Sequence, residues 1–122
     1  MIAYVCLGTA DLERATQYYN ALLAPMGAKM LMDFGRGRAW GTAPDKPMLS
    51  AILPFDGQPA APGNGTMTAL YCSSKEQVDS QYKLALELGG TDEGPAGQRG
   101  DGFYAGYFRD LDGNKLCFCH FG

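Results

Sequence analysis

The sequence repeats its own pattern, and this repeat limits the folds that the chain can adopt. Residues 4–27 align without a gap on residues 67–90, an offset of 63 positions. Few positions are identical, but the pattern of residue classes agrees almost throughout, and Leu23 falls on Leu86. Two copies of one supersecondary unit predict a chain built from two similar modules, neither of which buries its apolar face alone.

Each copy begins with a short apolar segment, passes through a polar cap into an amphipathic helix and ends at glycine. Apolar side chains recur at helical spacing and form one stripe on each helix. The stripes consist of Leu12, Ala15, Tyr19, Leu22 and Leu23 in the first copy and of Val78, Tyr82, Ala85 and Leu86 in the second. Asp11 is placed to cap the first helix, and Ser73-x-x-Glu76 has the form of a capping box for the second. Gly27 and Gly90 suit the two helix ends.

Strand patterns flank each helix. The alternation of apolar and polar residues predicts strands over 2–8, 28–34, 38–42 and 48–54 in the first copy and over 66–72, 91–94, 102–109 and 115–121 in the second. Asp112-Gly113 marks a tight turn between the last two strands. The order strand, helix and three strands therefore occurs twice.

The two copies are separated by a segment rich in Pro and Gly at 56–65, which is typical of a linker. We therefore predict one domain over residues 1–122, with module 1 at 1–55 and module 2 at 66–122. The predicted fold class is α+β, in which two βαβββ modules form a curled mixed sheet, or cup, with the helices outside.

Composition and charge exclude several classes of partner. The 122 residues carry a formal net charge of −3, whereas nucleic acids and anionic membrane surfaces select basic patches. No apolar run approaches the ~18 residues that a membrane-spanning helix needs. Residues 1–15 lack the basic start and the long apolar core of a signal peptide, so the four cysteines are expected to stay reduced in the cytoplasm.

Motifs near both ends of the chain are shared with a known family. "LGTADLERATQYYNALLAPMG" (7–27) and "YFRDLDGNKLCFCHFG" (107–122) resemble segments of the vicinal oxygen chelate superfamily. This group includes glyoxalases, extradiol dioxygenases, fosfomycin-modifying enzymes and bleomycin-resistance proteins. The resemblance covers the whole chain and implies the same duplicated βαβββ plan.

The resemblance also implies where a divalent metal would be bound. Metal-dependent members use histidine on the first strand of each half and glutamate on the last strand, and the matching positions here are Tyr4, Met67 and Cys117. A further ligand late in the first half would fall near Ser50 or Ile52, and neither is a carboxylate. Because such ions need several imidazole or carboxylate donors, we expect no metal and no other cofactor. Soft Cu(I) held by Met67 and Cys117 stays open as an alternative.

Strand alternation assigns the side chains that face the cup, and most of them are aromatic or soft. The expected ligand-binding residues are Tyr4, Cys6, Met67, Tyr71, Phe103, Tyr107 and Cys117, with Ala69 and Cys119 on the same side. The alternative is that these residues only pack the interior. Arg36, Arg38 and Arg99 are expected in loops at the mouth of the cup. His120, the only histidine, is out of phase with the cup, which favours a packing or surface role.

Three functions are compatible with such a lining. The favoured one is a glyoxalase/bleomycin-resistance-like protein that binds a small apolar or aromatic molecule without a metal, and no catalytic residue is assigned. The second is a glyoxalase-like lyase or isomerase, or a dioxygenase-type enzyme, with metal-free or soft-metal chemistry and Tyr4 or Tyr107 as acid or base. The third uses Cys117 as a thiolate nucleophile or redox sensor, which needs a nearby cation to lower the pKa of the thiol. Since relatives commonly dimerise, a homodimer is expected.

Overall fold

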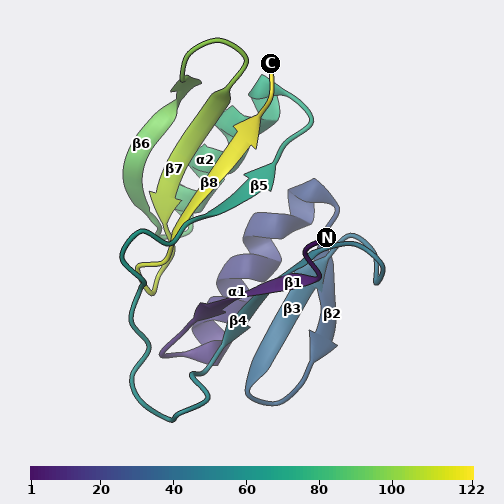
Figure 1. Ribbon diagram of the computed structural model, residues 1–122, viewed down its shortest axis with the longest axis vertical. Coiled ribbons are helices and arrows are strands. Elements are labelled where there is room, and N and C mark those ends of the chain that lie inside the picture. The colour runs from purple at the N-terminus through teal and green to yellow at the C-terminus, as the bar shows by residue number, and fades with distance from the viewer. The chain divides into compact units, whose positions relative to one another are not determined.

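The computed structural model describes residues 1–122, which form two compact units, Met1–Pro62 and Gly63–Gly122. Each unit consists of a strand, a helix and three further strands (Figure 1). The duplicated βαβββ plan and the α+β fold class that the repeat predicts are therefore confirmed. That the two sheets together form a cup stays a prediction.

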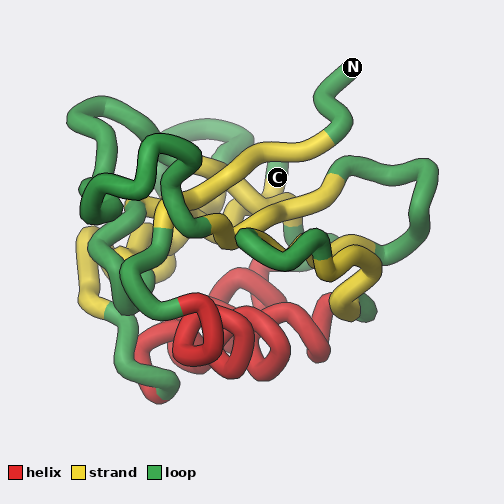
Figure 2. Tube along the Cα trace, turned by 90° about the horizontal axis from the view of Figure 1, so that it is seen from below, coloured by secondary structure: helices red, strands yellow, loops and turns green.

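The N-terminal unit contains a four-stranded mixed sheet in the order β1-β4-β3-β2. Its elements are β1 (Tyr4–Gly8), α1 (Leu12–Leu23), the 3-10 helix η1 (Ala24–Met26), β2 (Lys29–Asp33), β3 (Gly37–Gly41) and β4 (Met48–Ile52). β1 pairs parallel with β4, and the remaining neighbours pair antiparallel. Helix α1 packs on β2, β3 and β4 on one face of this sheet (Figure 2), which leaves the other face without a helix of this unit.

The C-terminal unit repeats this arrangement in the order β5-β8-β7-β6. Its elements are β5 (Thr68–Tyr71), α2 (Lys75–Glu87), β6 (Thr91–Gln98), β7 (Tyr104–Arg109) and β8 (Lys115–His120). The first strand again pairs parallel with the last, and α2 packs on β6, β7 and β8. Strand β6 extends four residues beyond the predicted end at residue 94, because an edge strand tolerates the Pro and Gly that suggested a loop.

In each unit the sheet face toward the helix carries large buried side chains. Tyr19 of α1 packs on Trp40 of β3 with ring centroids 5.5 Å apart, and the Nε1–H of Trp40 donates to Asn20 Oδ1 at 2.7 Å. In the second unit, Phe108 of β7 and Phe118 of β8 stack with centroids 5.3 Å apart. Because strand side chains alternate, the remaining side chains of each strand lie on the opposite face of its sheet.

The helix caps agree with the sequence for α1 and differ by one residue for α2. Asp11 accepts a hydrogen bond from the backbone N–H of Arg14 at 3.1 Å, as predicted. Helix α2 is capped by Ser74 rather than Ser73, since Ser74 Oγ accepts from the N–H of Gln77 at 3.1 Å. The Gln77 side chain in turn accepts from the N–H of Ser73 at 2.9 Å. Neither helix is long and apolar enough to cross a membrane.

The predicted tight turn between β7 and β8 is confirmed, and Asp110 organises it. Its Oδ1 accepts from the backbone N–H groups of Asp112 and Asn114, both at 2.9 Å, and its Oδ2 accepts from the Asn114 side chain at 3.0 Å. Gly113 has φ +86°, a conformation that favours glycine. This turn fixes the start of β8 and thus the strand phase of Cys117.

Candidate ligand-binding site

The face of the N-terminal sheet opposite α1 carries two of the predicted binding residues, Tyr4 and Cys6. The strand register places Tyr4 beside Met48 and Cys6 beside Ser50, and Ala39 of β3 lies on the other side of Ser50. Because directly paired residues point to the same side of a sheet, these five side chains share one face. We call it the open face, since no helix of this unit covers it.

A cavity of about 550 Å³ lies on the open face. This volume is within the range typical of small-molecule sites, roughly 300–1,000 Å³. Apolar side chains from all four strands dominate the lining, and charged residues occupy its ends. The cavity is lined by Ile2, Ala3, Tyr4, Cys6, Met32, Phe34, Arg36, Ala39, Pro44, Asp45, Lys46, Met48, Ser50 and Ile52.

The polar groups of the cavity are few and separated. Ser50 is 1% exposed, and its hydroxyl has no hydrogen-bond partner. Arg36 lies just before β3, where its Nη1 donates to the carbonyl oxygen of Leu53 at 2.7 Å and its guanidinium lies 5.3 Å from the Phe55 ring centroid. Asp45 and Lys46 lie between β3 and β4, at the other end of β3. The cavity thus has one buried hydroxyl between two charged ends.

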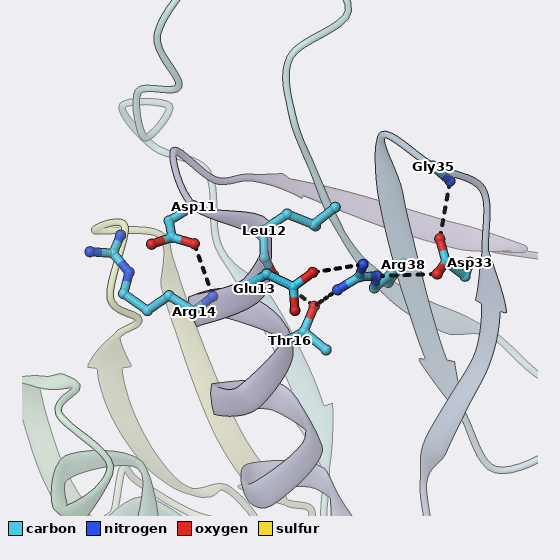
Figure 3. Close-up of polar contacts among 8 residues, drawn as sticks. All are labelled: Asp11, Leu12, Glu13, Arg14, Thr16, Asp33, Gly35 and Arg38. Atoms are coloured by element: carbon cyan, nitrogen blue, oxygen red, sulfur yellow. Dashed lines mark hydrogen bonds and ion pairs between the residues drawn. The ribbon is translucent and has the colours of Figure 1, made fainter.

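Arg38 does not lie in a loop, so that prediction is wrong. It is the second residue of β3, within the strand that alternation predicted over 38–42, and its register opposite Ala51 places it on the helix side. Figure 3 shows its guanidinium between Glu13, Thr16 and Asp33. Nη2 lies 2.9 Å from Glu13 Oε1, Nη1 donates to Thr16 Oγ1 at 2.9 Å, and Nε lies 3.4 Å from Asp33 Oδ2. The Glu13 carboxylate raises the pKa of Arg38, so this arginine ties α1 to β2 and β3.

The other two arginines do lie in loops, as predicted. Arg36 contributes to the cavity lining. Arg99 follows β6, and its guanidinium lies 5.4 Å from the ring centroid of Tyr107. It therefore covers one of the predicted binding residues within the C-terminal unit.

Three predicted binding residues of the C-terminal unit lie together. Cys117 is fully buried with Ala105 and Cys119, and the partly buried Phe103 and Tyr107 pack against this cluster. The register of β8 with β7 places Tyr107 beside Cys117, on the one face where strand alternation put both. These side chains form a packed cluster, which is what the alternative interpretation of the lining expects.

The remaining two predicted residues are more exposed. Tyr71 is 55% exposed on β5, and its ring centroid lies 5.6 Å from that of Phe121. Met67 is 41% exposed and precedes the first residue of β5. The Nδ1–H of His120 donates to the carbonyl oxygen of Cys72 at 2.8 Å, in line with the packing or surface role that the sequence favoured.

Burial keeps the Cys117 thiol protonated. Removal from water raises its pKa to about 12, and Cys119 adds to the shift, whereas Lys115 opposes it only weakly. Burial likewise raises the pKa of Cys72 to about 12 and that of Cys119 above its ordinary value. A protonated thiol is a poor nucleophile, so the environment of Cys117 opposes its use as a thiolate.

The residues present do not fit the divalent metal that the resemblance implies. No group of three or more His, Cys, Asp or Glu side chains converges in the structure. The matching positions hold the phenol of Tyr4, the thioether of Met67 and the protonated thiol of Cys117. A metal would have to displace a proton from Cys117 against a pKa of about 12, with no imidazole or carboxylate beside it.

Most residues that line the cavity were not predicted as binding residues from the sequence. Met48, Ser50 and Ile52 share a face with Tyr4 and Cys6 only because β4 pairs with β1. Ser50 and Ile52 were considered solely as possible metal ligands. These residues could have been found by assuming that the first and last strands of the module pair in parallel. The alternation of β4 would then have placed them on the same face as Tyr4 and Cys6.

Comparison with known proteins places the chain in a family. Residues 1–118 match the family model described as Glyoxalase/Bleomycin resistance protein/Dioxygenase superfamily. A crystal structure of a glyoxalase/bleomycin resistance protein from Albidiferax ferrireducens T118 is 34% identical, with a TM-score of 0.91, and the match covers 100% of this chain and 99% of that one. No curated protein matches the chain.

More distant structures share the fold. A hypothetical protein from S. aureus is 24% identical with a TM-score of 0.76, over 98% of this chain and 92% of that one. A glyoxalase-related enzyme from Fulvimarina pelagi is 21% identical with a TM-score of 0.76, over 98% of this chain and 86% of that one. With the family model and the duplicated βαβββ units in agreement, the chain belongs to the Glyoxalase/Bleomycin resistance protein/Dioxygenase superfamily.

Proposed function

We propose that the chain is a small-molecule-binding protein that takes an apolar or aromatic ligand on its open face without a metal. The observation that carries this proposal is the cavity of about 550 Å³ with its largely apolar lining. Met32, Met48, Phe34 and Tyr4 offer polarizable surfaces that suit flat, apolar molecules. Such a cavity gains free energy mainly by removing the apolar surface of the ligand from water.

We favour binding over metal-dependent catalysis because of the donor chemistry. A phenol, a thioether and a thiol with a pKa of about 12 supply none of the ligands that a Lewis-acidic ion requires. The similar structure from Albidiferax ferrireducens is named a glyoxalase/bleomycin resistance protein, so its name spans both possibilities. A thiolate mechanism at Cys117 has no support from its surroundings either.

The experiment is a calorimetric titration with 2-naphthol and naphthalene as probes. We expect saturable binding of at least one probe, and loss of that binding in Cys6→Trp, which places an indole in the cavity. Gln17→Trp adds the same ring at an exposed position of α1 outside the lining and should retain binding. Failure of both probes to bind, or equal binding by wild type and Cys6→Trp, would contradict the proposal.

We further propose that the protein is a homodimer in the cytoplasm. Large apolar side chains are exposed in each unit, among them Ile2 (56%) and Phe55 (89%) in the first and Phe121 (67%) in the second, and association would remove such surface from water. All four cysteines are free thiols, in keeping with a reducing compartment. Light scattering at high micromolar concentration should give the mass of two chains, and a monomer mass would contradict the dimer. Subcellular fractionation tests the compartment.

A further inference from the structure

We infer that Ser50 is a specificity-determining residue of the cavity and that its hydroxyl bonds a neutral hydroxyl or carbonyl oxygen of the ligand. This inference rests on the proposed function, because it assumes that the open-face cavity is where the ligand lies. Ser50 is 1% exposed, lines the cavity and has no hydrogen-bond partner. The only other buried side-chain atom without a hydrogen bond, Arg38 Nε, is compensated by the Asp33 carboxylate 3.4 Å away.

A buried hydroxyl without a partner is unfavourable, so its surroundings indicate what satisfies it. Burying such a group without a hydrogen bond destabilises a fold, and the great majority of buried polar atoms are therefore paired. The strand register places Cys6 on one side of Ser50 and Ala39 on the other. Alanine offers no polar atom, and a thiol is a weak partner. The remaining direction is the cavity itself.

Water is a poor substitute for a ligand at this position. A buried water molecule typically needs two to four polar partners. The side chains next to Ser50 on the open face are Cys6, Ala39, Met48 and Ile52, and none of them is a strong donor or acceptor. An oxygen fixed on an apolar ligand meets the hydroxyl without needing further partners.

The charges of the cavity indicate that this oxygen is neutral. Arg36 lies beside Gly37, which pairs with Ile52, and Lys46 precedes Met48, so both cations lie at the ends of β4. Ser50 is two strand positions from Met48 and from Ile52, which corresponds to ~7 Å of strand in either direction. A carboxylate held at Ser50 would be removed from water without a paired cation, which is strongly unfavourable. The expected ligand is therefore an aromatic or mostly apolar molecule that carries a neutral hydroxyl or carbonyl oxygen.

The test uses probes that differ in one group, titrated calorimetrically into the full chain. 2-Naphthol and 2-acetylnaphthalene carry a neutral oxygen, naphthalene carries none, and 2-naphthoate carries a charge. We expect wild type to bind the oxygenated neutral probes about five- to tenfold more tightly than naphthalene, the effect of one hydrogen bond. Ser50→Ala should remove this preference and keep naphthalene binding, which also shows that the variant is folded. Ser80→Ala removes an exposed hydroxyl of α2 and should leave the preference intact.

The outcomes separate this inference from the proposed function. If wild type binds all neutral probes equally, or if Ser50→Ala keeps the preference, the role of Ser50 is wrong and the binding function stands. Tighter binding of 2-naphthoate than of 2-naphthol would overturn the neutral ligand class. If no probe binds wild type, the proposed function fails and the inference fails with it. Should Ser50→Ala not fold, the wild-type ranking of the probes together with Ser50→Cys decides the same question.

Discussion

The four cysteines should differ sharply in reactivity, because three are buried and one lies in the cavity. At pH 8, a thiol with the ordinary pKa of 9.0 is partly ionised, whereas the pKa of Cys117 is about 12. Each pKa unit changes the ionised fraction tenfold, so the thiolate of Cys117 is ~1,000-fold scarcer than in an unfolded chain. Cys72 has the same raised pKa of about 12, and burial hinders reagent access to both. Cys6 is exposed on the open face.

The assay is labelling with 5,5′-dithiobis(2-nitrobenzoic acid) at pH 8, followed by mass spectrometry of the labelled peptides. We predict one fast-reacting thiol per chain, assigned to Cys6, and four after denaturation. Cys6→Ser should have no fast thiol, and a saturating aromatic probe should slow the labelling of Cys6 in wild type. Labelling of Cys117 in the fast phase would contradict this prediction, because it would show an accessible thiolate where the structure has a buried thiol.

Two further predictions concern stability. The folded chain keeps protons on Cys72 and Cys117 that the unfolded chain releases above pH 9, since the pKa of each is raised from 9.0 to about 12. The free energy of unfolding measured in urea should therefore show no thiol dependence below pH 9 and fall between pH 9 and 12, by up to ~1.4 kcal/mol per pH unit for each thiol. Cys117→Ala should remove the contribution of one thiol to this pH dependence. An unchanged slope of the free energy of unfolding against pH would contradict the raised pKa of Cys117. Asp110→Ala should lower the free energy of unfolding by about 2–4 kcal/mol, because a buried carboxylate that accepts three hydrogen bonds is lost. The exposed Asp101→Ala should change it by less than about 0.5 kcal/mol, and equal effects of the two substitutions would show that the turn is not held by Asp110.

Much of the fold could be predicted because the repeat and the strand alternation are local properties of the sequence. Seven strands were predicted to within two residues at either end, and α1 began where Asp11 indicated. Strand β6 was predicted too short because Gly94 and Pro95 resemble a loop, and only its position at the sheet edge makes them acceptable. The α2 cap was misplaced because two serines precede the helix and either has the required chemistry.

The site was less predictable, because it depends on which strands become neighbours. Alternation alone put Tyr107 and Cys117 on one face, and the turn between β7 and β8 then sets their pairing locally. The pairing of β1 with β4 is nonlocal, and it is this pairing that brings Ser50 beside Cys6. Arg38 was expected in a loop at the mouth of the cup although it is the first residue of the strand predicted over 38–42, and its ion pair with Glu13 forms only once α1 has packed.

Whether the open-face cavity binds an apolar ligand without a metal is decided by the affinity of a probe in the absence and in the presence of metal. The dissociation constant of 2-naphthol is determined for protein dialysed against EDTA and for the same protein with added zinc. The donor chemistry at Tyr4, Met67 and Cys117 predicts saturable binding with the same dissociation constant in both samples. Binding that disappears with EDTA and returns with zinc would show that a metal is part of the site, and would contradict the account.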